Sequence, residues 1–107
     1  MNPGDVVVGV LAGAGEAKVR PAVVIASREY LVEHPDVLVG IVTTKTPGRS
    51  TSSDCVLQDW QAAGLRAESW FRAYVLTMHR LELSVIGHVS ERGWNSVRVC
   101  VRASFAI

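Results

Sequence analysis

The sequence predicts a mainly β (α+β) protein, built as a small β-barrel or curled sheet with one α-helix at its C-terminal end. Short apolar runs rich in β-branched residues recur along the chain. Polar loops containing glycine or proline separate them, which is the pattern of successive short strands. Helical spacing of apolar residues is sustained only near the C-terminus. The chain does not alternate strands with long helices, so a doubly wound α/β fold is not expected.

Length and charge limit the possible classes of function. The chain has 107 residues, which we interpret as one domain spanning residues 1–107. Its formal net charge is +1, so no overall field attracts nucleic acid, and an anion site must come from local clustering of cations. No apolar run approaches the roughly 18 residues of a membrane span, and the N-terminus lacks the layout of a signal peptide. We therefore expect a cytoplasmic protein without a membrane segment.

Three apolar runs in the first half of the chain predict strands. The first is Val6–Leu11 and the third is Val37–Val42. Between them, Ala22–Ile25 is predicted as a strand buried on both faces, with Pro21 at its first position, where the ladder can begin one residue later. A loop of small residues, Ala12–Val19, is expected to join the first two strands as a hairpin connection that can lie over a groove.

Capping residues and helix breakers predict two short helical segments. Ser27 can cap a helix of one or two turns that ends before Pro35. Asp59–Gly64 is predicted as a single helical turn, with its aspartate as the cap and its glycine at the close. The polar loop Lys45–Ser53 contains two cations and is expected to be the most mobile internal segment.

The second half of the chain is predicted to contain further strands and then the helix. Asp54–Leu57 resembles a short strand, Leu65–Met78 indicates a strand pair with a bend, and Leu83–Val89 indicates one more strand. Ser90 is a good N-cap for the C-terminal helix. The apolar stripe of that helix follows spacings of three, four and four residues and consists of Trp94, Val97, Val101 and Phe105.

Arg20 stands at the mouth of the second predicted strand. A guanidinium has five donors in a fixed fork and keeps its charge at any working pH, which suits it to binding an anion. Taken alone, such an arginine is more often a solvated residue at the end of a loop. Lys18, Arg28, Lys45 and Arg49 come from loops that a barrel can bring together around it. These residues would form a local basic rim despite the near-neutral total charge.

Six stretches of the chain, in this order and at this spacing, resemble one family. They are Gly4–Val7 (GDVV), Arg20–Ile25 (RPAVVI), His34–Val37 (HPDV), Ile41–Thr44 (IVTT), Leu57–Leu65 (LQDWQAAGL) and Ile86–Ser90 (IGHVS). Together they are similar to the MazF/PemK family, the ribonuclease toxins of type II toxin–antitoxin systems. The resemblance covers almost the whole chain and depends on the six stretches in register.

The resemblance implies a compact β-barrel of the SH3-like kind with a C-terminal helix, acting as a homodimer. Members of the family cut single-stranded RNA at short sequences without a metal ion or cofactor, and leave a 2′,3′-cyclic phosphate and a 5′-hydroxyl. A cognate antitoxin is the implied protein partner, and any contact with DNA would be made only through the antitoxin complex.

The resemblance also implies particular site residues. In the family, the arginine at the start of the R-P strand and the first threonine of the T-T pair are catalytic or contact phosphate, which points to Arg20 and Thr43. Some members use an acid as general base in the region matching residues 66–69, where this chain has Glu68; as a surface residue, that glutamate would instead pair with a nearby arginine. The residues expected to bind RNA are Lys18, Arg28, Lys45, Arg49, Arg66, Ser69 and Arg72. The loop around residues 13–18 departs from the family's pattern, so the cleavage preference of relatives is not transferred.

Metal-free RNA cleavage requires removal of the 2′-hydroxyl proton, stabilisation of charge on the phosphate oxygens and protonation of the leaving oxygen. Arg20 suits the second task because its planar fork can bind two phosphate oxygens at once. It is a poor proton donor because it holds its proton too tightly. Thr43 can donate one hydrogen bond to the same phosphate, although a threonine pair is also an ordinary strand sequence. Since the attacking group is the 2′-hydroxyl, DNA should not be cut.

Two other functions remain open from the sequence. A toxin of the same barrel fold that binds DNA gyrase, as in the CcdB family, acts through its C-terminal helix and a terminal aromatic residue, and Phe105 stands in such a place. The third possibility is a barrel that binds RNA without cutting it. The R-P-A-V-V stretch, together with Arg20 and Thr43, favours the nuclease.

Overall fold

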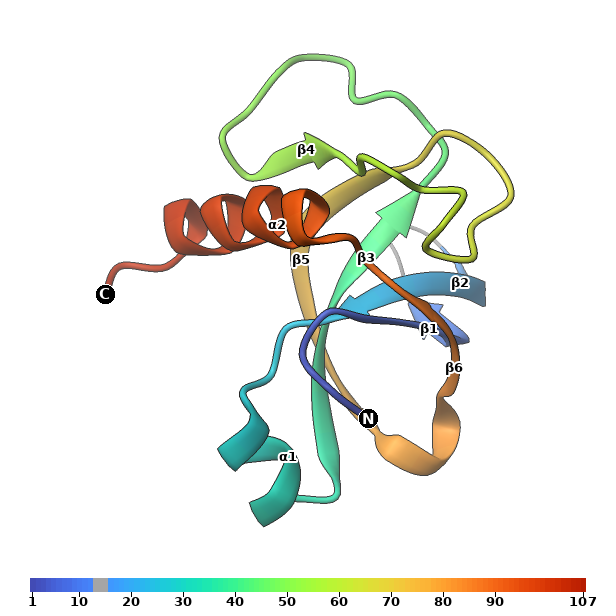
Figure 1. Cartoon of the computed structure of the whole chain (residues 1–107), viewed down its shortest axis with the longest axis vertical. Coiled ribbons are helices and arrows are strands. Elements are labelled where there is room, and N and C mark those ends of the chain that lie inside the picture. Colours follow the sequence, from blue (N-terminus) through green and yellow to red (C-terminus); the bar gives the residue numbers. More distant parts are fainter. Residues whose placement is uncertain (13–15) are drawn as a thin grey trace.

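The computed structural model describes residues 1–12 and 16–107 and shows a six-stranded sheet that curls around itself, with a helix packed on one side (Figure 1). The strands are β1 (Asp5–Ala12), β2 (Ala17–Val24), β3 (Asp36–Thr43), β4 (Asp54–Val56), β5 (Trp70–His79) and β6 (Ser84–His88). The helices are α1 (Arg28–Glu33), the 3₁₀ turn η1 (Arg80–Glu82) and the C-terminal α2 (Glu91–Ser104). The predicted fold class, mainly β with a C-terminal helix, is confirmed. Within the described residues, no helix has both the length and the apolar character that a membrane crossing requires.

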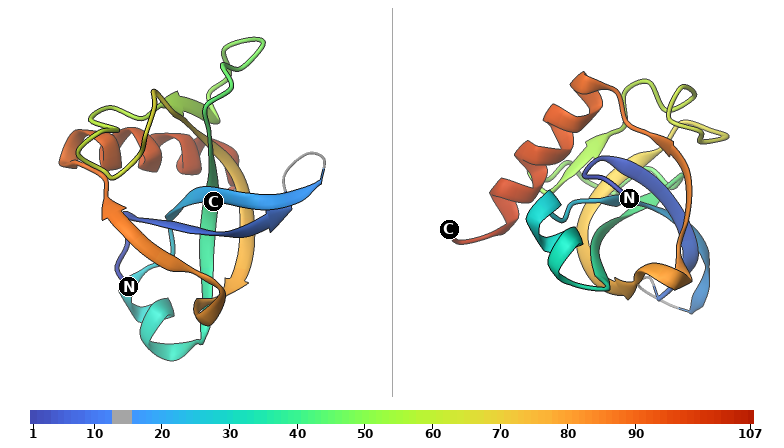
Figure 2. Two further views of the ribbon diagram at one scale, coloured as in Figure 1. Left: turned by 90° about the vertical axis from the view of Figure 1, so that its right-hand side faces the viewer. Right: turned by 60° about the horizontal axis from the view of Figure 1, so that its bottom comes forward.

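Neighbouring strands are antiparallel throughout the sheet, in the order β4-β5-β3-β2-β1-β6. β1 and β2 cross β3 and β5 steeply, so the sheet folds into a half-open barrel (Figure 2). α2 packs against β4 and β5, whereas α1 packs at the start of β3 (Figure 1). The other end of β3 lies away from α1 (Figure 1).

The curl gives the central strands two buried faces. Val6 and Val23 belong to the apolar cluster beneath α2. Val7, Ala22 and Val24 belong to a second cluster inside the curl, where α1 also packs. Because alternate residues of a strand point to opposite faces, both faces of β2 are covered over Ala22–Val24. The prediction of a strand buried on both faces is confirmed.

β2 begins earlier than predicted. The strand starts at Ala17, so Arg20 and Pro21 lie inside it and not at its mouth. β2 pairs with β1 along almost its whole length, but with β3 only over Ala22–Val24. At Pro21, the edge of β2 that faces β3 therefore has no ladder partner. A strand tolerates proline at such an unpaired edge, because no ladder hydrogen bond is lost there. The centre of the predicted small-residue loop, residues 13–15, lies outside the described residues.

A single strand replaces the strand pair predicted over Leu65–Met78. β5 starts only at Trp70, and residues 65–69 form a loop. The predicted bend corresponds to a β-bulge, where the pairing of β5 with β3 shifts between Gly40 and Ile41.

In this bulge, Gly40 of β3 pairs with Val75 of β5, whereas the next residue, Ile41, pairs with Arg72. Two consecutive β5 residues, one of them Tyr74, are left without a partner on β3. Bulges of this kind bend a strand and redirect its side chains.

Asp59 does not cap a helix, contrary to the prediction. Residues 58–64 form consecutive turns, and Asp59 has a φ of 60°, in the left-handed region that aspartate and asparagine tolerate. Its carboxylate accepts hydrogen bonds from Ser90 Oγ at 2.6 Å and from the guanidinium of Arg92 at 2.7 and 2.8 Å. Arg92 contributes most, and these hydrogen bonds hold the pKa of Asp59 well below its usual range. The turn is thereby tied to the start of α2.

α2 begins as predicted, and Trp94, Val97 and Val101 of its predicted stripe pack against the apolar cluster. Ser90 is its N-cap and accepts a hydrogen bond from the backbone N–H of Gly93 at 3.1 Å. Val97 and Cys100 are buried, whereas Phe105 lies beyond the last helical residue and is exposed. The predicted stripe is therefore wrong at Phe105, because the helix ends before that residue.

Two cysteines lie next to each other where α2 packs against β4. The thiols of Cys55, on β4, and Cys100 are both free. Burial raises the pKa of Cys55 to about 12, and the neighbouring Cys100 thiol adds to this effect. Burial also raises the pKa of Cys100.

Most of the other predicted elements are confirmed. Ser27 caps α1 by accepting a hydrogen bond from Tyr30 N at 3.1 Å, and the helix ends at His34, which is extended. β1, β3, β4 and β6 cover the predicted apolar runs, with small differences at their ends. The segment Lys45–Ser53 contains neither helix nor strand.

Candidate active site

β2 and β3 separate at one end of their ladder, and a pocket of about 500 Å³ opens there. The last ladder pair joins Ala22 and Ile41. Continued by two residues, this register sets Arg20 opposite Thr43 on the same face of the sheet. Both residues line the pocket. The fold thus brings together the two residues on which the predicted chemistry depends.

Arg20 holds a donor without a partner. Its Nη2 donates to the backbone oxygen of Glu16 at 3.4 Å, whereas its Nε is buried and has no hydrogen-bond partner among the described residues. A buried N–H without a partner destabilises the protein, because it has lost its hydrogen bonds to water and gained none in return. The side chain also lines the pocket, so an anion bound there can meet its guanidinium.

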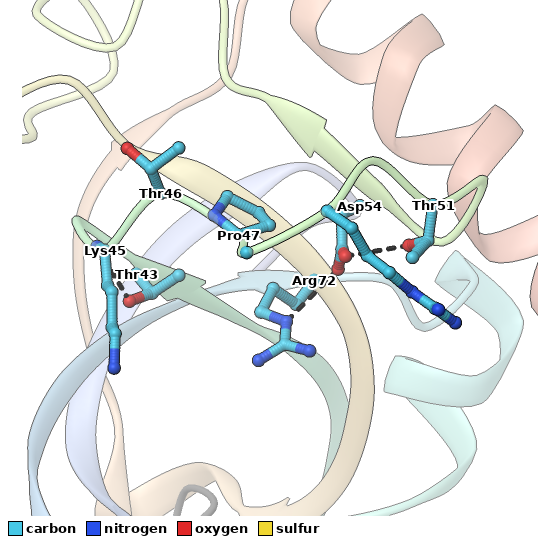
Figure 3. Close-up of a pocket in the computed structure, with 9 residues that line it drawn as sticks. Thr43, Lys45, Thr46, Pro47, Thr51, Asp54 and Arg72 are labelled. Carbon is cyan, nitrogen blue, oxygen red and sulfur yellow. Dashed lines mark hydrogen bonds and ion pairs between the residues drawn. The ribbon is translucent and has the colours of Figure 1, made fainter.

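The backbone orients the hydroxyl of Thr43. Its Oγ1 accepts a hydrogen bond from Lys45 N at 3.1 Å (Figure 3). Because a hydroxyl can accept and donate at the same time, its hydrogen remains available for an acceptor in the pocket. Arg20 and Thr43 therefore offer an N–H and an O–H to the same space.

A second pocket, of about 510 Å³, continues the first beneath the loop that follows β3 (Figure 3). Thr43, Lys45 and Arg72 line both pockets, and we call the two pockets together the groove. The other residues around the second pocket are Thr46, Pro47, Gly48, Arg49, Thr51 and Asp54.

Asp54 holds Arg72 where the two pockets meet. The two residues are direct partners in the ladder between β4 and β5. Arg72 Nε donates to Asp54 Oδ1 at 3.1 Å, and Thr51 Oγ1 donates to Asp54 Oδ2 at 2.8 Å (Figure 3). The side chain of Asp54 is 7% exposed and that of Arg72 is 49% exposed, so the carboxylate is covered while the guanidinium reaches solvent.

Cations dominate the groove. Among the described residues that line it, the cations are Lys18, Arg20, Lys45, Arg49 and Arg72. The carboxylate among them belongs to Asp54, which is already bound to an arginine. A chain of net charge +1 thus concentrates positive charge in one place, as binding of a polyanion requires. Tyr74, next to the bulge, also lines the groove and is partly exposed, so its ring offers a surface on which a base can stack.

The residues expected from the sequence to bind or cut RNA divide into two groups. Those in the groove are Lys18, Arg20, Thr43, Lys45, Arg49 and Arg72. Those elsewhere are Arg28, Arg66, Glu68 and Ser69. Arg28 projects from α1 and donates to Asn2 Oδ1 at 2.8 Å.

The loop before β5 keeps the other three residues out of the groove. Arg66 and Glu68 are exposed and line neither pocket. Ser69 is 1% exposed and donates to the backbone oxygen of Ala67 at 2.7 Å, so its hydroxyl is occupied within the loop. Arg72, a possible partner of Glu68 from the sequence, pairs with Asp54 instead.

Among the other residues that line the groove, Thr51, Asp54 and Tyr74 are not expected from the sequence. Asp54 reaches the groove through the register of β4 and β5, which pairs it with a residue 18 positions away. Tyr74 stands two residues after Arg72 on β5, so both can face the groove. An acid at the start of a short strand, after a hydroxyl-rich loop, is the one local signal for the first two.

Comparison with models of protein families matches residues 2–105 to the family described as "PemK-like, MazF-like toxin of type II toxin-antitoxin system". The chain belongs to the PemK/MazF toxin family. The resemblance predicted from the six stretches is therefore confirmed, and the protein is a toxin of a type II toxin–antitoxin system. No curated protein sequence matches the chain.

Solved structures of PemK/MazF toxins share this fold. An endoribonuclease in complex with its cognate antitoxin from a mycobacterial species aligns with a TM-score of 0.80 at 17% identity, over 97% of this chain and 93% of the other. The Mycobacterium tuberculosis toxin MazF-mt6 aligns with a TM-score of 0.77 at 16% identity, over 96% and 97% of the two chains. MazF from Deinococcus radiodurans aligns with a TM-score of 0.76 at 14% identity, over 100% and 97%. At such low identity these likenesses establish the common fold.

Proposed function

We propose that this toxin is an endoribonuclease that cuts single-stranded RNA in the groove without a metal ion or cofactor. The observation that supports this most directly is the buried Nε of Arg20, without a partner among the described residues, in a pocket shared with the hydroxyl of Thr43. A phosphodiester supplies the acceptor oxygens that two such donors need. The remaining cations of the groove can hold the RNA backbone on either side, and Tyr74 can stack a base and contribute to sequence preference.

In the proposed reaction, the 2′-hydroxyl of one nucleotide attacks the adjacent phosphorus. The bond between phosphorus and O5′ breaks, which leaves a 2′,3′-cyclic phosphate, while the leaving oxygen takes up a proton and becomes a 5′-hydroxyl. Negative charge builds up on the non-bridging oxygens in the transition state. Arg20 and Thr43 donate to these oxygens, and stabilisation of this kind is usually the largest single contribution of such a site.

The carboxylates near the groove are poorly placed for proton transfer or metal binding. Both oxygens of Asp54 already accept hydrogen bonds, one from Arg72 and one from Thr51. A magnesium site would need carboxylate oxygens free to bind the ion. Glu68 lies outside the groove and has no role in this proposal. Catalysis then rests on positioning and charge stabilisation, with protons exchanged through water in the open groove.

We further propose that the protein acts as a homodimer and is held inactive by a cognate antitoxin. The mycobacterial endoribonuclease was solved with its cognate antitoxin, and MazF of Deinococcus radiodurans was solved as a MazE–MazF complex. An acidic antitoxin segment would fit the cations that we assign to the RNA backbone. The exposed apolar side chains of Val99, Phe105 and Ile107 suit a contact with a second copy.

The test is cleavage of a mixed-sequence single-stranded RNA by antitoxin-free protein in EDTA, beside Arg20→Ala and a DNA oligonucleotide of the same sequence. The parent should cut the RNA and leave cyclic phosphate ends. The variant should cut at least about 100-fold more slowly, because a main donor to the transition state is gone. DNA should remain intact because it lacks the attacking hydroxyl.

Each other outcome points elsewhere. RNA that is bound but not cut by the parent would indicate a non-catalytic RNA-binding barrel. Absence of RNA binding together with inhibition of DNA gyrase would indicate the CcdB-like activity. Equal rates for the parent and Arg20→Ala would remove Arg20 from the mechanism.

A further inference from the structure

We propose that Asp54 is a positioning residue for RNA, which holds the guanidinium of Arg72 so that its outer nitrogens bind the phosphate next to the scissile one. This inference rests on the proposed function, because it adds a second phosphate site to the same groove. It concerns how the RNA strand is held and not how it is cut.

The place of Arg72 in the sheet suits a neighbouring phosphate. Ladder pairs set it in one lateral row with Ile41 and Ala22. Arg20 and Thr43 stand two residues further along their strands, a distance of about 7 Å. Arg72 also lines both pockets, whereas Arg20 lines only the first. An RNA strand that runs from one pocket into the other therefore meets the two arginines in succession.

The carboxylate engages the inner edge of Arg72 and leaves the outer edge free. Asp54 accepts the hydrogen bond from Nε, and neither Nη nitrogen donates to any residue that the structure describes. The second carboxylate oxygen is fixed by Thr51, whose Oγ1 also lies 3.2 Å from Ser53 Oγ. This network fixes the guanidinium through its Nε edge. A guanidinium that is already fixed loses less conformational entropy when it binds a phosphate.

Because Asp54 is negatively charged, the positioning role predicts the opposite change in RNA affinity from the one that its charge alone predicts. A carboxylate in a groove that binds a polyanion repels that polyanion. If Asp54 had no other effect, its removal would strengthen RNA binding. If it positions Arg72, its removal weakens RNA binding, although the groove becomes more positive.

The experiment measures binding of a fully 2′-O-methylated single-stranded RNA, which cannot be cut because its attacking hydroxyls are blocked. Fluorescence anisotropy over a series of salt concentrations compares the parent with Asp54→Asn, Arg72→Ala and the double variant. We expect Arg72→Ala to weaken binding roughly tenfold or more and to reduce the salt slope by about 0.7, the value for one phosphate contact on a single strand. Asp54→Asn alone should weaken binding roughly tenfold.

The double variant carries the decisive comparison. Once Arg72 is gone, Asp54 can only repel, so Asp54→Asn should strengthen binding in the Arg72→Ala background. Asp36→Asn is the matched control, because it removes the same charge at the opposite end of β3, outside both pockets. Its dissociation constant should stay within about twofold of the parent's, since a single charge outside the groove is largely screened.

Tighter binding by Asp54→Asn alone, or an equal loss with and without Arg72, would overturn the positioning role. Thermal unfolding by circular dichroism shows whether the variants are folded. If Asp54→Asn is not, Thr51→Val replaces it, because that change removes one hydrogen bond to the carboxylate and keeps the charge. It should weaken binding about threefold, and only when Arg72 is present.

The failure of this inference and the failure of the proposed function give different results. A parent that binds the methylated RNA in an Asp54-dependent way but leaves ordinary RNA intact would retain the positioning role and refute cleavage. A parent that cuts RNA while Asp54→Asn binds more tightly would do the reverse. A parent that binds no RNA would overturn both.

Discussion

At the scale of single residues, the groove contains a residue with a buried donor that the described part of the chain does not satisfy. Nearly all buried N–H groups find a partner when a protein folds. The Nε of Arg20 is buried without one among the described residues. An unsatisfied donor of this kind destabilises the free protein and is relieved when an anion binds. Arg20 therefore lowers the stability of the free protein, while the proposed RNA binding depends on it.

This conflict predicts that Arg20→Met separates the two properties. Methionine is about as long as arginine but has no donor to desolvate. We expect RNA cleavage to be lost, and the free energy of unfolding to stay equal or to rise by about 1 kcal/mol. Urea unfolding at neutral pH measures the second effect. A variant less stable than the parent would show that Arg20 contributes to the fold through its packing.

Asp59 predicts a dependence of stability on pH. Its pKa is lowered in the folded protein, mainly by the hydrogen bonds from Arg92 and then by that from Ser90. A lowered folded-state pKa contributes stability that is present above the unfolded-state value, near 3.8, and is lost as the pH falls through the folded-state value. Asp59→Asn tolerates the positive φ but removes the charge and one of the two acceptor oxygens that Ser90 and Arg92 use, so it should lower the unfolding midpoint in urea at pH 7.

The same comparison at lower pH supplies the control. At pH 3 the parent should have lost part of this contribution, so the difference between the parent and Asp59→Asn should be smaller than at pH 7. A difference that stays constant between pH 7 and pH 3 would mean that the hydrogen-bonded charge of Asp59 is not what stabilises the turn.

At the scale of the elements, the packing of β3 against β5 beside the bulge depends on a glycine. A Cβ on Gly40 would lie 2.4 Å from Cε1 of Phe71, inside the space of a ring that is fully buried. The backbone of β3 and this ring therefore approach more closely than any other residue type would allow. The bulge follows directly, and Tyr74, one of the β5 residues that it leaves unpaired on β3, lines the groove.

Gly40→Ala should consequently lower the free energy of unfolding by about 1–3 kcal/mol, the usual effect of overpacking in a core. Gly48→Ala is the matched control, since its Cβ would meet no described atom within 4 Å. That variant should change the free energy of unfolding by less than about 0.5 kcal/mol. Chemical unfolding of both variants measures the difference, and similar losses at the two positions would contradict the packing explanation.

The sequence predicts elements that local signals determine. The apolar runs of β1, β3 and β6 and the serine caps of α1 and α2 depend on residues close in the chain, and these predictions are confirmed. The errors fall where distant contacts decide. Asp59 turns towards Arg92, 33 positions away, and β5 acquires its bulge only from its register against β3.

The same distinction applies to the candidate site. The resemblance points to Arg20 and Thr43 together, and both line the pocket that opens beyond the last ladder pair of β2 and β3. The sequence gives no signal that joins Asp54 to Arg72, because only the pairing of β4 with β5 brings them together. The expectation that Arg28 comes from a loop at the rim is wrong, because Arg28 belongs to α1 and lines neither pocket.

At the scale of the whole molecule, a net charge of +1 coexists with a strongly cationic groove. Attraction between exposed charges is screened over about 10 Å at ordinary salt concentration, so the position of a cation matters more than the total. Lys45 and Arg28 carry the same charge but differ in position. Lys45 lines both pockets, whereas Arg28 lies on α1, outside the groove.

Lys45→Glu and Arg28→Glu change the net charge equally, but we expect only the first to weaken RNA binding. Loss of one cation from the groove should reduce the salt slope by about 0.7, and the added carboxylate should weaken binding further. The measurement is fluorescence anisotropy with a methylated single-stranded RNA at low and moderate salt. Equal effects of the two variants would mean that overall charge, and not the groove, attracts the RNA.

The ladder between β1 and β6 determines when, during synthesis, the sheet of the toxin can be completed. It sets Asp5 opposite His88, 83 positions later in the chain. β1, β2 and β3 are neighbours in sequence and can pair early, whereas β6 must close a loop almost as long as the protein. On a ribosome, the strands that carry Arg20 and Thr43 can thus assemble while β1 still presents an unpaired edge. A chain released before β6 would keep that edge open to pairing with other chains, so premature termination should yield aggregates and not a smaller toxin.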